Sequence, residues 1–307
     1  MSAGLQQRPA PGRRRDGRAA RPGPAAREGL DRYDRVAQAS AGEVIAGYST
    51  SFGWACRLLA EPVRTHVRNL YALVRVADEI VDDPDPSLSP AWRREQLDAL
   101  EAEAYRALSS TRSTNLVVHA FALTARRYGI GRELVEPFFA SMRADLVRTH
   151  HDEASLGEYV HGSAEVVGLM CLRVFTGGDT AAYERLRPGA ERLGAAFQKV
   201  NFLRDLAADH DELGRTYFPG LDPAAFSDAH RDELLDGIDA DLAAAAAVIG
   251  QLPDSSRRAV LAAHGLYAAL SRRLRATPAE RIRTARVRVP DAQKALILVR
   301  ALAGVAA

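Results

Sequence analysis

The chain has 307 residues, of which 47% are hydrophobic and 26% charged, and its formal net charge is +2. Its two cysteines, Cys56 and Cys171, lie far apart in sequence, which excludes a disulfide framework and a cysteine metal site and fits a reducing cytoplasm. No apolar stretch reaches the roughly 18–20 residues that a membrane-spanning helix needs. We therefore expect a cytoplasmic protein that is soluble or peripheral at the membrane.

The start of the chain differs in composition from the rest. Residues 1–28 contain seven Arg against Asp16 and Glu28, a net charge of +5, among many Pro, Gly and Ala. Such a stretch buries too little apolar surface to offset the entropy lost on ordering. We predict a disordered basic tail over residues 1–30, solvated rather than bound to a membrane, and a single all-α domain over residues 31–307.

Beyond the tail, nearly every segment has a helical hydrophobic period, and alternating β-branched runs are scarce. Gly, Pro, Ser or Asp interrupt this pattern at Asp83–Pro90, Ser109–Ser113, Tyr128–Gly131, Phe175–Thr180, Gly214–Asp222 and Leu252–Ser255. The pattern predicts one all-α bundle of about eight to ten helices.

The first predicted helix of chemical interest carries a polar stripe on an otherwise apolar segment. Within Val67–Asp83, the residues Tyr71, Arg75, Asp78 and Asp82 are spaced so that they share one helical face. Carboxylates four residues apart on one face destabilise a helix by about 0.2–0.5 kcal/mol, and burying them costs more unless a cation neutralises them. A solvated helix surface would show the same spacing, so this stripe alone does not identify a site.

A second stripe follows later in the chain. Within Arg192–Glu212, the residues Gln198, Asn201, Asp205 and Asp209 also share one face, again beside buried-type apolar residues. Two acidic pairs on two apolar helices favour a functional interpretation over two solvated surfaces. Carboxylate oxygens suit Mg²⁺, which usually combines one or two carboxylates with substrate phosphates. Together the stripes predict two acidic walls that bind Mg²⁺ and a diphosphate.

Four ordered motifs resemble the squalene/phytoene synthase family over roughly residues 48–219. They are Tyr48-Ser-Thr-Ser-Phe-Gly-Trp-Ala55, then Arg64–Asp83 with its Arg75-x-x-Asp78-x-x-x-Asp82 core, then Tyr159 with Val166–Met170, and last Phe197–Asp209 with the trailer Gly214-Arg215-x-Tyr217-x-Pro219. Glu79 replaces an Asp that many relatives carry, and Glu165 stands where a small residue is common. The sequence gives no role for Glu165.

The resemblance implies the isoprenoid synthase fold, a single bundle around a central cavity, and a set of site residues. It implies catalytic roles for Tyr71, Arg75, Asp78, Asp82, Tyr159, Asp205 and Asp209, and metal ligation by Asp78, Asp82, Asn201, Asp205 and Asp209. Diphosphate contacts would come from Ser49, Ser51, Arg75, Arg204, Arg215 and Tyr217. A hydrocarbon channel would be lined by Phe52, Val167, Gly168, Leu169 and Gln198. The adjacent His150 and His151 cannot share one helical face, and we interpret them as surface residues.

The implied reaction joins two isoprenyl diphosphates head to head through a cyclopropylcarbinyl diphosphate. The motifs look most like bacterial members that make phytoene from two geranylgeranyl diphosphates. A squalene- or dehydrosqualene-forming enzyme that uses two farnesyl diphosphates is the alternative, and a non-catalytic helical scaffold is a weaker one. Mg²⁺, with Mn²⁺ as a substitute, is the expected cofactor, and NADPH is not expected. Expected partners are the substrates and a membrane surface that receives the product, with no nucleic acid.

Overall fold

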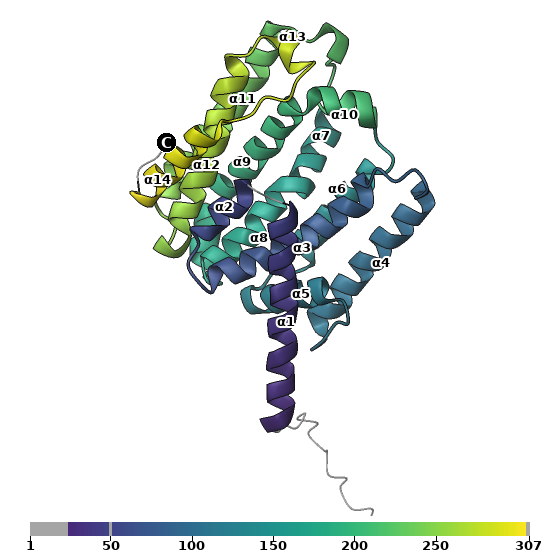
Figure 1. Ribbon diagram of the computed structural model, residues 1–307, viewed down its shortest axis with the longest axis vertical. Coiled ribbons are helices and arrows are strands. Elements are labelled where there is room, and N and C mark those ends of the chain that lie inside the picture. The colour runs from purple at the N-terminus through teal and green to yellow at the C-terminus, as the bar shows by residue number, and fades with distance from the viewer. Residues whose placement is uncertain (1–23, 49–50, 305–307) are drawn as a thin grey trace, which may run out of the picture.

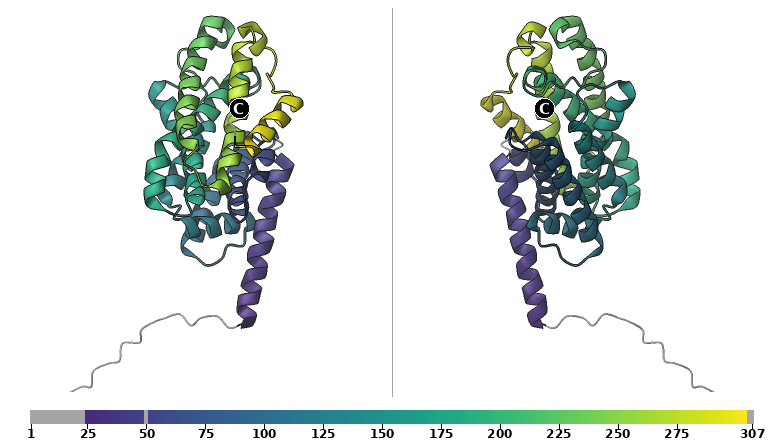
Figure 2. Two further views of the ribbon diagram at one scale, coloured as in Figure 1. Left: turned by 90° about the vertical axis from the view of Figure 1, so that its left-hand side faces the viewer. Right: turned by 90° about the vertical axis from the view of Figure 1, so that its right-hand side faces the viewer.

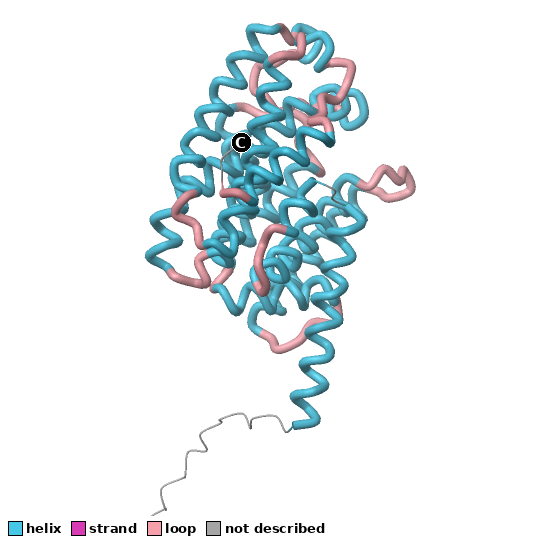
Figure 3. The backbone as a smooth tube through the Cα atoms, turned by 60° about the vertical axis from the view of Figure 1, so that its left-hand side comes forward, coloured by secondary structure: helices cyan, strands magenta, loops and turns pink. Residues whose placement is uncertain are grey.

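The computed structural model describes residues 24–48 and 51–304, and the described side chains exclude those of residues 24–30, 51–52 and 210–213. The described residues form helices and loops, with no β-strand among them, as the tube in Figure 3 shows. Their only β-type pairing is an isolated bridge between His150 and Thr216. The all-α prediction is confirmed.

The helices are more numerous and shorter than the eight to ten predicted, because several run for only one to three turns. In chain order they are α1 (Pro24–Tyr48), α2 (Ser51–Arg57), α3 (Val63–Asp82), α4 (Pro90–Ser109), α5 (Leu116–Tyr128), α6 (Arg132–Asp145), α7 (Glu153–Val160), the π-helical turn η1 (His161–Glu165), α8 (Val166–Phe175), α9 (Thr180–Arg204), α10 (Leu206–Leu213), the 3₁₀ turn η2 (Pro223–Ala225), α11 (Asp228–Ile249), α12 (Asp254–Arg275), α13 (Ala279–Ile282) and α14 (Asp291–Leu302).

All six predicted interruptions fall where helices end, and their residue types explain why. Gly129 closes α5 in the left-handed region with φ of 68°, a conformation that glycine adopts without a Cβ penalty. Asn115 and Asp179 begin α5 and α9 by accepting backbone N–H groups with their side chains. The sequence pattern does not show the breaks before α3, around residues 146–152 or at Asp205.

The bundle has two main groups of buried residues. One lies among α3, α4, α5, α6 and α8, with Phe121, Phe138 and Phe139 at 1% exposure or less. The other lies among α9, α11 and α12 and includes Leu203, Leu235 and Leu274. Helix α8 packs against both α3 and α9 and so connects the two groups of buried residues (Figure 1).

Helix α1 begins at Pro24, inside the segment predicted to be a tail, and its first turns extend beyond the body of the molecule (Figure 2). It meets the body where Tyr33 donates to the Ser113 carbonyl at 2.7 Å and Asp34 lies 2.7 Å from the buried His119 ring. Residues 1–23 lie outside the described part of the chain, so the tail stays a prediction. Within the described residues, no helix combines the length and hydropathy that a membrane span requires.

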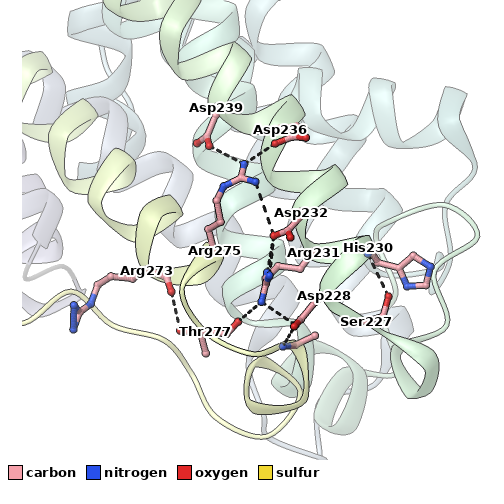
Figure 4. Close-up of polar contacts among 11 residues, drawn as sticks. Ser227, Asp228, His230, Arg231, Asp232, Asp236, Asp239, Arg273, Arg275 and Thr277 are labelled. Atoms are coloured by element: carbon pink, nitrogen blue, oxygen red, sulfur yellow. Dashed lines mark hydrogen bonds and ion pairs between the residues drawn. The ribbon is translucent and has the colours of Figure 1, made fainter.

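Ion pairs join the first turns of α11 to the end of α12 (Figure 4). The buried Arg231 guanidinium donates to Asp228 at 2.8 Å and to the Thr277 carbonyl at 2.7 Å, and it also pairs with Asp232. Arg275 pairs with Asp236 and Asp239 from the opposite helix. These contacts fix the end of α12 and thereby the start of the segment that leads through α13 to α14.

Candidate active site

Helix α3 carries the first polar stripe as predicted. Leu70, Leu73 and Ala77 are at most 2% exposed and bury one face of the helix, which turns Asp78 and Asp82 toward the other. Arg75 lies one turn before Asp78, where it forms an ion pair with Glu79 and its guanidinium stacks 4.5 Å from the centroid of the Tyr48 ring.

The sequence pattern predicted that the second stripe lies on one helix, but the structure divides it between two. Helix α9 ends at Arg204, and Asp205 caps it with φ of −99° and ψ of 8° before α10 begins. Hydrogen bonds from Asp205 N to Asn201 O and from Asp209 N to Asp205 O, both 2.9 Å, keep nearly helical spacing across the break. The acidic groups therefore stay on one wall, but Asp205 sits at a bend.

Arg215 links the two acidic walls. Its backbone N–H donates to the Asp209 carbonyl of the second wall at 2.8 Å. Its guanidinium is nearly buried and donates to Asp82 of α3 at 2.9 Å and to the Asp145 carbonyl at 3.1 Å. Burial, followed by the neighbouring charge of Asp82, raises the pKa of Asp78 to about 7, and burial with the charge of Asp205 raises the pKa of Asp209 to about 7. Asp82 also raises the pKa of Asp209, so carboxylates from the two walls lie close enough to repel.

Asp145 is a site residue that the sequence analysis missed. Its carboxylate accepts the Tyr159 hydroxyl at 2.7 Å, and burial raises its pKa to about 7 against the opposing effect of Arg215. It lies within electrostatic range of both Asp78 and Asp82. The signal was present in the sequence, because Asp145 follows Phe138 and Met142 on the buried face of α6, where an acid is unusual.

An aromatic group stands beside these acids. Tyr217 stacks on Phe202 with ring centroids 3.9 Å apart, and Tyr159 lies 5.5 Å from Tyr217. The His151 ring also stacks on Tyr217, with ring centroids 5.8 Å apart, and burial lowers the pKa of His151. The interpretation of His151 as a surface residue was therefore wrong, because the loop before α7 turns this ring inward, whereas His150 is exposed.

A cavity of about 630 Å³ adjoins the second wall. Among the residues that the structure describes, five cationic side chains and no carboxylate line it, and the cations are Arg75, Arg204, Arg286, Arg288 and Lys294. Apolar groups complete the lining, among them Phe197 stacked 3.8 Å from the Tyr267 ring. Such a lining suits a ligand with an anionic head and an apolar body.

Three of these cations come from the C-terminal part of the chain and were not predicted. Arg286 forms an ion pair with Asp205 at 2.8 Å, and Asp205 is also bound by the neighbouring Arg204. Arg288 lies in the same loop as Arg286, and Lys294 lies in α14. The segment Arg283–Arg288 has the sequence Arg-Thr-Ala-Arg-Val-Arg, and this run of cations beside apolar residues was the available signal.

Several predicted residues cannot be placed or lie elsewhere. Ser49 lies outside the described residues, as do the side chains of Ser51 and Phe52 at the start of α2. Leu169 is 1% exposed in the core around α3, and Val167 packs against the same core. Gly168 approaches the Ala190 carbonyl of α9, Gln198 is half-buried on α9, and neither lines the cationic cavity. The channel assignment stays a prediction.

The π-helical turn between Tyr159 and Val166 gives Glu165 a contact. Glu165 lies 2.9 Å from the Nδ1 atom of His161 across this turn. The turn is tightly enclosed, because a Cβ at Gly162 would lie 2.1 Å from the Pro137 carbonyl oxygen, and one at Gly194 would lie 2.8 Å from the Ala164 carbonyl oxygen. π-Helical turns of this kind are frequent near functional sites.

The donor set fits a divalent cation that shares its coordination with substrate. Within the described residues, no group of three His, Cys, Asp or Glu side chains is close enough to hold a metal ion unaided. Mg²⁺ commonly takes one or two carboxylates and completes its shell with water and phosphate oxygens. The raised pKa values of Asp78 and Asp209 reflect buried negative charge that such an ion would offset.

Comparisons with known proteins agree with this geometry. A 15-cis-phytoene synthase from Paracoccus sp. is 30% identical over 258 residues, which cover 76% of this chain and 80% of the relative. A 4,4'-diapophytoene synthase from Staphylococcus haemolyticus is 25% identical over 195 residues, covering 62% and 65%. The solved structure of a dehydrosqualene synthase superposes with a TM-score of 0.73 at 18% identity, over 90% of this chain and 98% of that one, and so shares the fold. The model of the squalene/phytoene synthase family matches residues 45–293, and the chain belongs to that family.

Proposed function

We propose that the protein joins two geranylgeranyl diphosphates head to head and forms phytoene through a cyclopropylcarbinyl diphosphate, as a step of carotenoid biosynthesis. The observation that carries the proposal is the pairing of two acidic walls, bridged by Arg215, with an adjoining cavity lined by five cations and apolar side chains. The bacterial relative named 15-cis-phytoene synthase, similar over most of both chains, supports the choice of product.

Each group has a role in this proposal. Arg75, Arg204 and Arg286 hold diphosphate oxygens, because guanidinium groups donate paired hydrogen bonds to such anions. Tyr159 and Tyr217 lie beside the acidic walls rather than in the cavity lining, and their rings would attract a carbocation that forms next to the departing diphosphate. The apolar cavity wall around Phe197 excludes water from the allylic cation and so prevents its hydrolysis.

Asp78, Asp82, Asn201, Asp205 and Asp209 would hold Mg²⁺, with Mn²⁺ as a substitute. When bound, this ion supplies positive charge that stabilises the departing diphosphate. The final carbocation loses a proton in phytoene formation, so NADPH is not required. Asp145 orients the Tyr159 hydroxyl, and Arg215 holds the Asp82 carboxylate in place.

The second candidate is condensation of two farnesyl diphosphates to dehydrosqualene or squalene. The relative named 4,4'-diapophytoene synthase supports it, at lower identity and coverage than the phytoene synthase relative. Both reactions use the same acidic and cationic groups. They differ in the length of hydrocarbon that the cavity must accept.

Product analysis separates these candidates. The purified chain is incubated with Mg²⁺ and either geranylgeranyl or farnesyl diphosphate, with and without NADPH, and the hydrocarbon is identified by mass. We expect a forty-carbon product from the twenty-carbon donor without NADPH. A thirty-carbon product from farnesyl diphosphate alone moves the protein to the second candidate. No hydrocarbon and no released diphosphate from either donor leaves only the scaffold interpretation.

A further inference from the structure

The last described helix, α14, has an apolar outer face. Ile297 and Ala301 are 4% and 1% exposed and pack the inner face of α14, which lies on α12. On the outer face, Leu296, Val299 and Leu302 are 58%, 62% and 51% exposed. A helix on the surface of a globular protein normally has polar residues there. These three side chains, which we call the α14 outer face, therefore expose apolar surface to water.

The surroundings of this face are strongly cationic. Residues 283–304 contain five basic residues, Arg283, Arg286, Arg288, Lys294 and Arg300, against one acid, Asp291, which is a net charge of +4. Arg288 and Arg300 are exposed. Two copies of the chain that met through this face would bring two such segments together, and their like charges would repel. An anionic lipid surface complements both the charge and the apolar side chains.

The face also lies at the rim of the cationic cavity. Lys294 of α14 lines that cavity together with Val287 and Val289 from the preceding loop. Tyr48 at the end of α1 and Ala55 of α2 also line it, and Tyr48 is 53% exposed. An exposed Tyr ring is typical of groups that sit at the headgroup level of a bilayer. Figure 2 shows α14 and the end of α1 on the same side of the molecule.

We propose that the α14 outer face docks the enzyme on an anionic lipid bilayer, with Arg288 and Arg300 on the headgroups and the cavity rim at the membrane surface. The proposal deepens the proposed function, because a hydrocarbon product without polar groups partitions into lipid and needs a short path there. Docking itself requires only the face and its charges, so it is measured without catalysis.

Vesicle flotation tests the docking. The full chain is mixed with vesicles of phosphatidylcholine alone or of phosphatidylcholine with a minor share of phosphatidylglycerol. The bound fraction is measured for wild type, for Leu296→Ser with Val299→Ser, and for Arg300→Glu. Each apolar side chain moved out of water contributes about tenfold or more in affinity, so the double variant should lose at least that factor. Arg300→Glu should weaken binding only when phosphatidylglycerol is present, and added salt should do the same.

The matched control is Val36→Ser, which removes a side chain that is 48% exposed on α1. This variant should bind vesicles as wild type does. Wild type that floats with neither vesicle, or a double variant that binds unchanged, overturns the proposal. A concentration-dependent dimer in sedimentation that the double variant abolishes assigns the face to a second copy instead. Vesicle binding without any hydrocarbon product would overturn the proposed function and leave the docking surface in place.

Discussion

Asp145 shows how one buried carboxylate organises several side chains. It accepts the Tyr159 hydroxyl through its side chain and the Arg215 guanidinium through its carbonyl. Asp145→Asn keeps the shape but weakens the hold on the Tyr159 hydroxyl, and we expect turnover to fall about 10- to 100-fold, the range found when an orienting partner is removed. Steady-state kinetics should show a lower kcat and an unchanged KM. The cyclopropylcarbinyl diphosphate intermediate should also be released from the enzyme.

The control for Asp145 is Tyr159→Phe, which deletes the other half of the same hydrogen bond. The double variant should be no slower than the slower single variant, because both changes remove one interaction. Fully additive losses would show that Asp145 acts independently of Tyr159. A change in Mg²⁺ dependence without a change in kcat would identify it as a metal ligand.

The buried acids also make stability depend on pH. Burial raises the pKa of Asp78, Asp145 and Asp209 from 3.8 to about 7. The folded chain therefore binds protons more tightly than the unfolded chain between these values, so the free energy of unfolding falls as pH rises from about 4 to about 7. Thermal unfolding in EDTA should give a higher Tm near pH 5 than near pH 8, and Asp145→Asn should reduce the difference. A Tm that rises steadily with pH would contradict the raised pKa values.

At the scale of elements, the contact between α9 and the π-helical turn η1 depends on Gly194. A Cβ there would lie 2.8 Å from the Ala164 carbonyl oxygen and 3.0 Å from the Glu165 Cα, both backbone atoms that cannot move alone. We expect Gly194→Ala to lower the free energy of unfolding by about 1–3 kcal/mol. Urea denaturation measures the change.

Gly237 provides the comparison for Gly194. It lies in α11, and a Cβ there would meet no atom within 4 Å. Gly237→Ala should raise the free energy of unfolding by about 0.5–1 kcal/mol, since alanine loses less backbone entropy in a helix. If both variants shifted the free energy of unfolding in the same direction, close packing against η1 would not explain why position 194 is a glycine.

At the scale of the whole molecule, the site exists only because α3 and the α9–α10 segment face each other in the folded bundle. We expect Asp78→Ala or Asp205→Ala to abolish hydrocarbon formation while circular dichroism and Tm show an intact fold. Because the two walls act together, the double variant should be no worse than either single one. Asp254→Ala, whose side chain is 89% exposed, is the control and should remain active. Full activity of either site variant with Mg²⁺ would overturn the assignment of the walls.

Local periodicity in the sequence predicts the all-α fold, the six loops and both acidic stripes, because helix faces depend on neighbours three and four residues away. It marks Asp145 and the cation run around Arg286 as unusual, but it does not place them or His151 at the site, because each reaches the site from an element whose place is fixed by packing between distant segments. The bend at Asp205 was not predicted from the sequence for a related reason. A stripe keeps its spacing across a capped break whose hydrogen bonds remain nearly helical.

The π-helical turn within α7, η1 and α8 has a consequence for how this stretch tolerates insertions and deletions. A π-helical turn accommodates one residue more than an α-helical turn, so the stretch Glu153–Phe175 is equivalent to a continuous α-helix with a single-residue insertion. Deleting one residue from His161–Glu165 would therefore convert the turn to an α-helical one and keep α7 and α8 nearly in register, whereas a deletion inside α8 would rotate the residues beyond it by about 100°. Val166 and Leu169 would stay on the buried face after the first deletion, so we expect this turn to accept the loss of one residue better than α8 does.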